Sequence, residues 1–91
     1  MALFTGHEQE LKMIGLNIAY YRKLTGLSQL QLAEAVGISR THMSNIEAPN
    51  MPTSLSLETL MDIADALGIE PYSLLIFRPE PAISKPNSTI Q

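Results

Sequence analysis

Two short helix patterns separated by one glycine constrain this chain more than any other feature. Residues 28–47 have the sequence SQLQLAEAVGISRTHMSNIE, in which Gly37 interrupts the segment near its middle. Glycine favours the end of a helix, yet apolar residues continue at helical spacing on both sides of it. The segment therefore predicts two short helices joined by a tight turn, with Ile38 packed inside the turn.

Serine residues mark where these two helices begin. Ser28, followed three residues later by Gln31, forms a capping box in which each side chain bonds the other residue's backbone N–H. Ser39 is expected to cap the second helix in the same position. The residues expected to face inward are Leu32, Ala33, Val36, Met43 and Ile46.

Two further helices are predicted from apolar periodicity, at about residues 8–25 and between Ser56 and Gly68. A short fifth helix is expected to begin near Pro71, which suits a first helical turn, and to carry Tyr72, Leu74 and Leu75. Gly15 interrupts the first of them and is expected to mark a close packing contact. The buried stripe expected on the helix at 57–67 consists of Leu57, Leu60, Met61, Ala64 and Leu67. Together these patterns predict an all-α fold of five helices.

The length and composition predict one small domain, residues 1–77, followed by a tail, residues 78–91. The chain has 91 residues, of which 45% are hydrophobic, enough for a modest aliphatic core. The tail contains three prolines and no helical pattern. It has two interpretations: a disordered end, or a segment that packs on a neighbouring subunit through Ala82, Ile83 and Ile90.

Several classes of site are disfavoured by the residues present. There is no cysteine, and His7 and His42 have no second ligand at metal spacing, so no metal site is expected. No serine–base arrangement or glycine-rich phosphate loop is present, so we expect neither an enzyme, nor a cofactor, nor a small-molecule substrate. No long apolar run or signal sequence is found, which predicts a cytoplasmic protein with no membrane partner.

The sequence from about residue 14 to residue 75 resembles the Cro/CI-type (XRE-like) helix-turn-helix repressors. The matching residues are IGLNIAYYRKLTGLSQLQLAEAVGISRTHMSNIE and SLETLMDIADALGIEPYSLL. The resemblance implies a compact five-helix, lambda-repressor-like DNA-binding domain, with the helix-turn-helix at about 28–47. It also implies a sequence-specific transcriptional regulator, expected to be a repressor, that binds double-stranded operator DNA as a homodimer.

The resemblance further implies which residues of the third helix contact base edges: Arg40, Thr41, Ser44 and Asn45. Helical spacing agrees, because these residues share the face opposite Met43 and Ile46. Their chemistry also fits, since arginine bonds guanine and asparagine bonds adenine in the major groove.

Backbone contacts to DNA are expected from four other polar residues: Gln29, Ser39, Asn50 and Ser54. The resemblance implies a phosphate contact for Gln29, and it implies a structural ion pair between Arg22 and Glu47. The family's usual Glu-x-Gly is here Glu47-Ala48-Pro49-Asn50, and the usual basic residues of that loop are missing. We therefore expect DNA affinity that depends only weakly on salt.

Charge keeps a second interpretation open. The net charge is −3, from six basic and nine acidic residues, which disfavours strong non-specific binding to nucleic acid. The alternative is a protein-interaction or antitoxin-like module on the same scaffold, with weak or no DNA binding. Arg40 and Asn45 discriminate between the two, because an interaction-only module has no need of base-bonding groups there.

Overall fold

The computed structural model describes residues 5–48, 50 and 53–77. The elements are η1 (Thr5–His7), α1 (Glu8–Thr25), α2 (Gln29–Val36), α3 (Arg40–Glu47), α4 (Leu57–Leu67) and η2 (Pro71–Leu75). The described part of the chain contains no strand, so the all-α prediction is confirmed. The predicted fifth helix is present as the 3-10 helix η2, which leaves four α-helices rather than five. The predicted tail at 78–91 lies outside the described residues.

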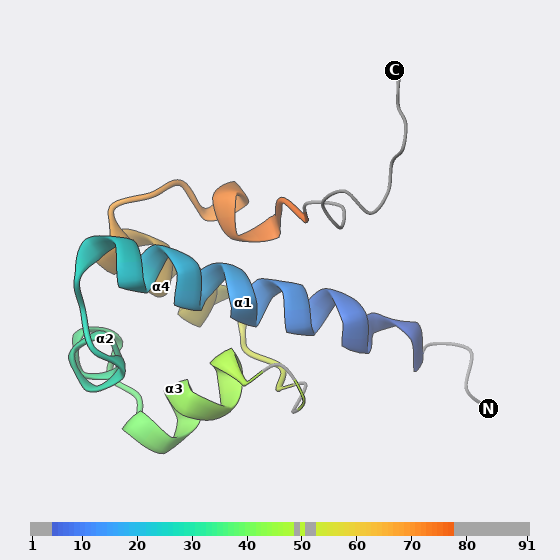
Figure 1. Cartoon of the computed structure of the whole chain (residues 1–91), viewed down its shortest axis with the longest axis horizontal. Helices are drawn as coiled ribbons and strands as arrows, with labels where there is room; N and C mark the ends of the chain where they lie inside the picture. The colour runs from blue at the N-terminus through green and yellow to red at the C-terminus, as the bar shows by residue number, and fades with distance from the viewer. Residues whose placement is uncertain (1–4, 49, 51–52, 78–91) are drawn as a thin grey trace.

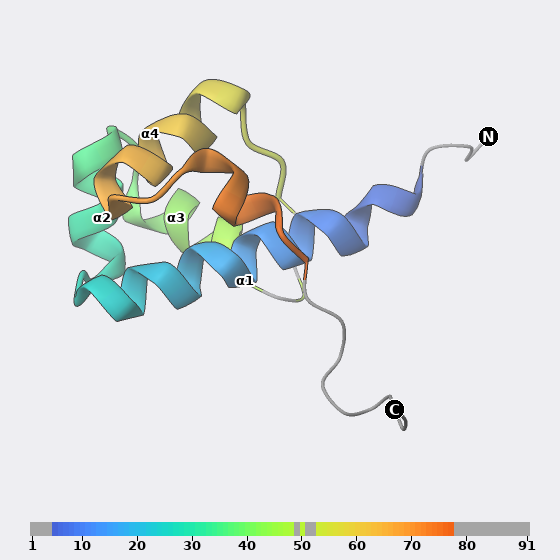
Figure 2. The ribbon, with the colours of Figure 1, turned by 90° about the horizontal axis from the view of Figure 1, so that it is seen from above.

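The long helix α1 organises the domain. It packs against α3, α4 and η2, while α2 packs against α3 and α4. Figure 1 shows α3 below α1 and η2 above it, and Figure 2 shows α4 and η2 side by side from the perpendicular direction. The two helices of the predicted helix-turn-helix, α2 and α3, therefore lie together at one side of α1.

Serines start three helices, and Ser28 and Ser39 do so as predicted. The Ser28, Ser39 and Ser56 hydroxyls accept hydrogen bonds from backbone N–H groups three residues later, at 3.0, 2.9 and 3.0 Å. The Ser28 N–H donates to the Gln31 side-chain oxygen at 2.8 Å, which completes the predicted capping box. Gly37 ends α2 with φ of 78°, a left-handed conformation that glycine adopts without steric cost. The tight turn between α2 and α3 is thus confirmed.

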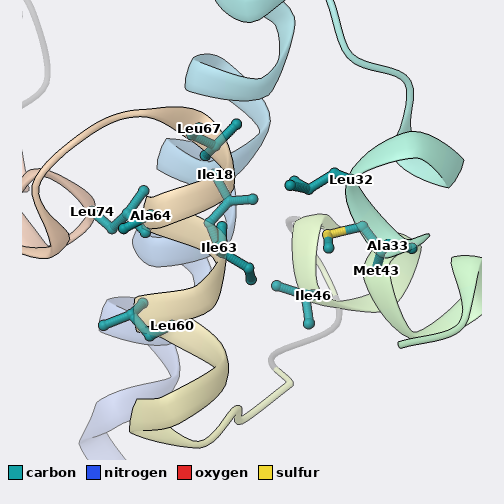
Figure 3. Close-up of a cluster of buried hydrophobic side chains, with 10 residues drawn as sticks. All are labelled: Ile18, Leu32, Ala33, Met43, Ile46, Leu60, Ile63, Ala64, Leu67 and Leu74. Carbon is teal, nitrogen blue, oxygen red and sulfur yellow. The ribbon is translucent and has the colours of Figure 1, made fainter. Parts of the chain in front are cut away.

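The core is aliphatic and draws on every α-helix and η2 (Figure 3). Its buried members are Ile18, Leu32, Ala33, Met43, Ile46, Leu60, Ile63, Ala64, Leu67 and Leu74. The predicted stripe of α4 was wrong in two positions, because Leu57 and Met61 are 71% and 49% exposed. Ile63 is buried instead. Apolar residues lie on two overlapping stripes of α4, and packing against α1 and α2 selects the stripe centred on Ile63.

A glycine allows α1 and α3 to approach each other through their backbones. Gly15 is buried, and a Cβ atom built on it would overlap the backbone oxygen of Ile46. No side chain larger than hydrogen fits there without a shift of one helix. The close contact predicted at Gly15 is confirmed, and it fixes where the end of α3 meets α1.

A buried amide attaches the last described residues to α1. The Asn17 side chain is 5% exposed, and its Nδ2 donates to the backbone oxygens of Leu74 and Ile76, each at 3.0 Å. These bonds satisfy carbonyl groups at the end of η2, which a helix of this kind leaves unpaired. The residues after η2 are thereby held alongside α1.

Candidate nucleic-acid interface

Helix α3 has a buried face and a polar outer face. Met43 and Ile46 are 0% and 3% exposed, and they anchor the helix to the core. The four predicted base-contacting residues lie away from this face. Arg40 and Thr41 are exposed, while Ser44 and Asn45 are half-buried. The outer face therefore offers a guanidinium, two hydroxyls and an amide on one short helix, which is the set of groups that can bond base edges.

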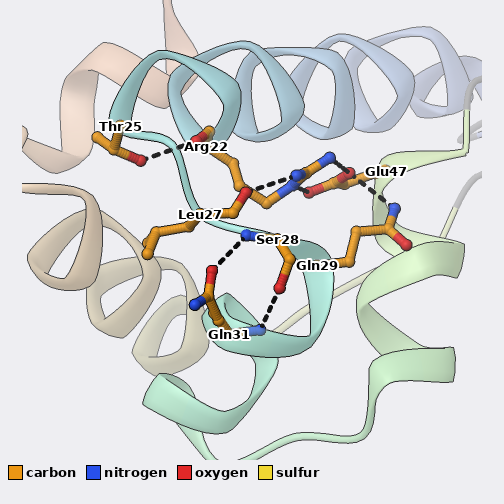
Figure 4. Close-up of polar contacts among 7 residues, drawn as sticks. All are labelled: Arg22, Thr25, Leu27, Ser28, Gln29, Gln31 and Glu47. Carbon is orange, nitrogen blue, oxygen red and sulfur yellow. Dashed lines mark hydrogen bonds and ion pairs between the residues drawn. The ribbon is translucent and has the colours of Figure 1, made fainter.

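The end of α3 is fixed to α1 by a buried ion pair (Figure 4). Arg22 Nε donates to Glu47 Oε2 at 2.7 Å and Arg22 Nη2 donates to Glu47 Oε1 at 3.0 Å. The third nitrogen, Nη1, donates to the backbone oxygen of Leu27 at 2.8 Å. The two side chains predicted to pair thus meet in a two-point contact that favours one orientation. All three guanidinium nitrogens of Arg22 are used within the domain.

Gln29, at the start of α2, joins this ion pair. Its Nε2 donates to Glu47 Oε1 at 2.9 Å, so Glu47 accepts from α1 and α2 together (Figure 4). No local sequence pattern indicates this bond, because the two residues are 18 positions apart. The bond leaves one hydrogen of the Gln29 amide nitrogen for another acceptor, since a side-chain amide carries two.

The other predicted backbone-contacting residues are spread around α3. Ser39 lies at the start of the helix, where its hydroxyl is the cap. Asn50 and Ser54 are exposed and follow the helix in the chain. Residues 49, 51 and 52 lie outside the described residues, so the altered loop after Glu47 stays a prediction. These three residues and Gln29 therefore come from different segments of the chain.

Charge on the described surface is distributed unevenly. Arg40 carries the single positive charge of α3, and Lys12 and Lys23 lie on α1. Helix α4 carries Glu58, Asp62 and Asp65, all exposed, and no basic residue. Because carboxylates repel phosphate, the outer face of α4 is electrostatically unfavourable for a polyanion, whereas the outer face of α3 carries no exposed carboxylate.

The described residues offer neither a metal-binding cluster nor a membrane-spanning helix. Within the described ranges, no group of three or more histidine, cysteine or acidic residues is placed to hold a metal ion. Among the described helices, none is both long and apolar enough to cross a membrane. The polar surface of α3 and its surroundings is therefore the candidate functional site.

Comparison with known proteins agrees with this geometry. The helix-turn-helix family model HTH_3 matches residues 18–74. The transcriptional regulator SinR of Bacillus subtilis is 36% identical over 63 residues, which are 69% of this chain and 56% of SinR. The chain thus spans little more than half the length of that relative.

Solved structures show the same arrangement of helices. The restriction-modification controller protein C.AhdI of Aeromonas hydrophila superposes with a TM-score of 0.69 at 32% identity, covering 76% of this chain and 97% of C.AhdI. SinR in complex with DNA superposes with a TM-score of 0.63 at 35% identity, covering 69% of this chain and 98% of that one.

Proposed function

Because the chain belongs to the helix-turn-helix family HTH_3, we propose that it is a sequence-specific DNA-binding transcriptional regulator. It acts as a repressor that binds operator DNA as a homodimer, with α3 in the major groove. Because such a regulator acts on chromosomal DNA, we place it in the cytoplasm. We expect no catalytic activity, since the relatives named above are regulators.

The observation that carries this proposal is the division of α3 into two faces. Met43 and Ile46 hold the helix in place from inside, while Arg40 and Thr41 are exposed outside. The major groove of B-DNA admits an α-helix, and its base pairs present distinct patterns of donors and acceptors there. A relative with the same helix arrangement has been crystallised with DNA, which supports this orientation.

The short length of α3 favours binding as a homodimer. Helix α3 has eight residues and covers only a few base pairs, whereas two copies about 34 Å apart read two half-sites on one face of the duplex. Exposed apolar side chains near the end of the described chain support such pairing: Tyr72, Leu75, Ile76 and Phe77.

Sedimentation equilibrium should detect a dimer at micromolar concentration, and Ile76→Ser with Phe77→Ser should shift it to monomer. A wild-type monomer at concentrations that saturate the operator contradicts the dimer.

The central experiment selects binding sites from random DNA and then compares variants on the selected site. Arg40→Ala should lose about 1–3 kcal/mol of binding free energy and relax the preference at one position of each half-site. Glu58→Ala, on the outer face of α4, is the matched control and should bind as wild type does. Fluorescence anisotropy at fixed salt measures both.

The alternative function is a protein-interaction or antitoxin-like module with weak DNA binding. The net charge of −3 and the carboxylates on α4 favour it. Under this alternative the selection enriches no sequence, and wild type and Arg40→Ala bind duplex DNA equally weakly. Enrichment of a symmetric site excludes it as the main function.

A further inference from the structure

The first half of α1, residues 8–17, lies before the region that the family model matches. The match begins at residue 18, whereas the helix begins at Glu8. Figures 1 and 2 both show this half of α1 extending past the other described helices, and in Figure 1 no described helix lies in front of it. The helix-turn-helix match therefore assigns no role to this segment, and its outer face is uncovered within the described part of the chain.

The outer face of α1 carries an apolar stripe, the α1 stripe, made of Met13, Leu16 and Tyr20. These residues are three and four positions apart, and they lie opposite Ile14 and Ile18, which face the core. Leu16 and Tyr20 are 43% and 51% exposed, and Met13 is half-buried. Because two helices pack against each other through stripes of this spacing, the α1 stripe predicts a helical partner.

A buried amide joins the α1 stripe to the η2 patch, which consists of Tyr72, Leu75, Ile76 and Phe77. Asn17 follows Met13 by one helical turn, and its Nδ2 donates to the backbone oxygen of Ile76 at 3.0 Å. The backbone of Ile76 is therefore held beside the stripe, and the side chains of Ile76 and Phe77 are 49% and 38% exposed. The α1 stripe and the η2 patch thus adjoin each other and form one apolar surface.

The η2 patch alone offers too little apolar area for a stable dimer. A specific interface buries about 800 Å² on each partner, of which about 500 Å² is apolar. At about 200 Å² for a large apolar side chain, the exposed fractions of the four residues in the η2 patch leave about 400 Å². Leu16 and Tyr20 add about 200 Å² by the same measure, so the two surfaces together reach the area that a dimer needs.

We propose that the α1 stripe and the η2 patch together bind a second copy of this chain, with the two α1 helices packed antiparallel about a two-fold axis near Leu16. Such a contact is isologous, so each copy contributes the same residues and Leu16 lies close to its own symmetry mate. An axis perpendicular to α1 runs these helices antiparallel and keeps both α3 helices on one side, below α1 in Figure 1. The proposal rests on the homodimer of the proposed function and names its surface.

This packing is compatible with DNA binding. The end of α3 contacts α1 at Gly15, where a Cβ atom would meet the backbone of Ile46. Gly15 lies away from the α1 stripe on the helix, so a second copy seated on the stripe leaves the outer face of α3 uncovered. The dimer and the operator therefore use different faces of the domain.

Single cysteines can report on this contact, because the chain has none of its own. Leu16→Cys should form a covalent dimer with a bismaleimide that spans about 8–10 Å, the distance between the axes of packed helices. Leu57→Cys, at an exposed apolar position of α4, is the matched control and should run as a monomer on a denaturing gel. Equal cross-linking of the two variants, or of neither, overturns the proposed surface.

A second pair of variants measures the contribution of the stripe to the dimer. Leu16→Glu with Tyr20→Glu should raise the dimer dissociation constant at least about tenfold, because each copy loses two apolar contacts. Leu57→Glu with Met61→Glu has the same spacing on α4 and should leave the constant unchanged. Sedimentation equilibrium measures both, and circular dichroism melting verifies that the variants remain folded.

The outcomes separate the stripe from the homodimer itself. A stripe variant that dimerises as wild type does overturns the role of α1, while loss of the dimer on Ile76→Ser with Phe77→Ser leaves the homodimer standing. If the stripe variant unfolds, the cross-linking of Leu16→Cys decides, since that substitution adds no charge. A monomeric wild type overturns both the surface and the homodimer, and selection of an operator by that monomer leaves the DNA-binding assignment intact.

Discussion

Helices α3 and α4 begin in the same way, with a serine hydroxyl that accepts from a backbone N–H three residues later. Both also bury an aliphatic stripe, centred on Met43 in α3 and on Ile63 in α4. Their outer faces differ. Helix α3 presents neutral polar groups and Arg40, whereas α4 presents carboxylates and the exposed Leu57 and Met61.

This difference shows that the buried face and the outer face of a helix have separate roles. The buried stripe determines where a helix packs. The stripes of α3 and α4 are of the same kind, since both are made of apolar side chains. The outer face decides what the helix can bind, because it makes no contribution to the core. The two acidic positions Glu47 and Asp62 show the same division, since the first is buried in an ion pair and the second is exposed.

The largest contrast between the two helices is expected when each loses a carboxylate. Glu47→Ala leaves Arg22 buried without its partner and should lower the free energy of unfolding by about 3–5 kcal/mol. Asp62→Ala, on the exposed face of α4, should change it by less than about 0.5 kcal/mol. Urea denaturation followed by circular dichroism measures both, and equal losses would show that α3 is not held by the ion pair.

The next contrast concerns the backbone contact that α3 makes with α1 at Gly15. Gly15→Ala places a methyl group against the backbone oxygen of Ile46, so α1 and α3 must move apart. We expect a loss of about 1–3 kcal/mol in unfolding free energy, the range for overpacked sites. Operator affinity should fall further than stability alone explains, because α3 tilts. A variant with wild-type stability would mean that the two helices separate at no cost.

Removing the two caps should cost the same in stability but not in binding. Ser39→Ala and Ser56→Ala each lose one hydrogen bond from a backbone N–H at a helix N-terminus, worth about 1 kcal/mol. Ser56→Ala also loses the bond that its hydroxyl donates to Thr59 Oγ1 at 2.9 Å, but this bond is exposed to water and adds little. Only Ser39→Ala should also weaken operator binding, since α3 starts there and Ser39 is a predicted backbone contact. Thermal unfolding and anisotropy on the same samples separate the two effects. Equal losses of binding would place α4 on the DNA as well.

The smallest effect is expected from the acidic face of α4. Asp62→Asn with Asp65→Asn removes two negative charges away from α3 and should raise affinity for random duplex by at most about twofold at physiological salt. The gain should vanish at high salt, where such charges are screened. A tenfold gain would mean that α4 lies close to the phosphates and that the contrast with α3 is incorrect.

The parts of the fold that depend on neighbouring residues could be predicted from the sequence. Ser28 and Gln31 bond each other across three positions, and Gly37 ends the helix they begin, so local chemistry alone places these boundaries. The division of α3 into a buried face and an outer face could also be predicted from residue spacing, because Met43 and Ile46 are its large apolar residues. The family resemblance supplied the pairing of Arg22 with Glu47, which spacing did not.

Several features that depend on distant residues were missed. Leu57 and Met61 fit an inward stripe of α4 as well as Ile63 does, and only the positions of α1 and α2 decide between them. The bonds of Gln29 to Glu47 and of Asn17 to the end of η2 join residues far apart in the chain. No periodicity encodes such bonds.

The contact of Gly15 with the backbone at Ile46 has a consequence for how binding preference can change over time. This contact between α1 and α3 involves main-chain atoms of α3, which are the same whichever side chains its outer face carries. Arg40, Thr41 and Asn45 can therefore be exchanged for other residues without redirecting the helix. A protein built in this way can acquire a new target sequence while keeping its scaffold unchanged.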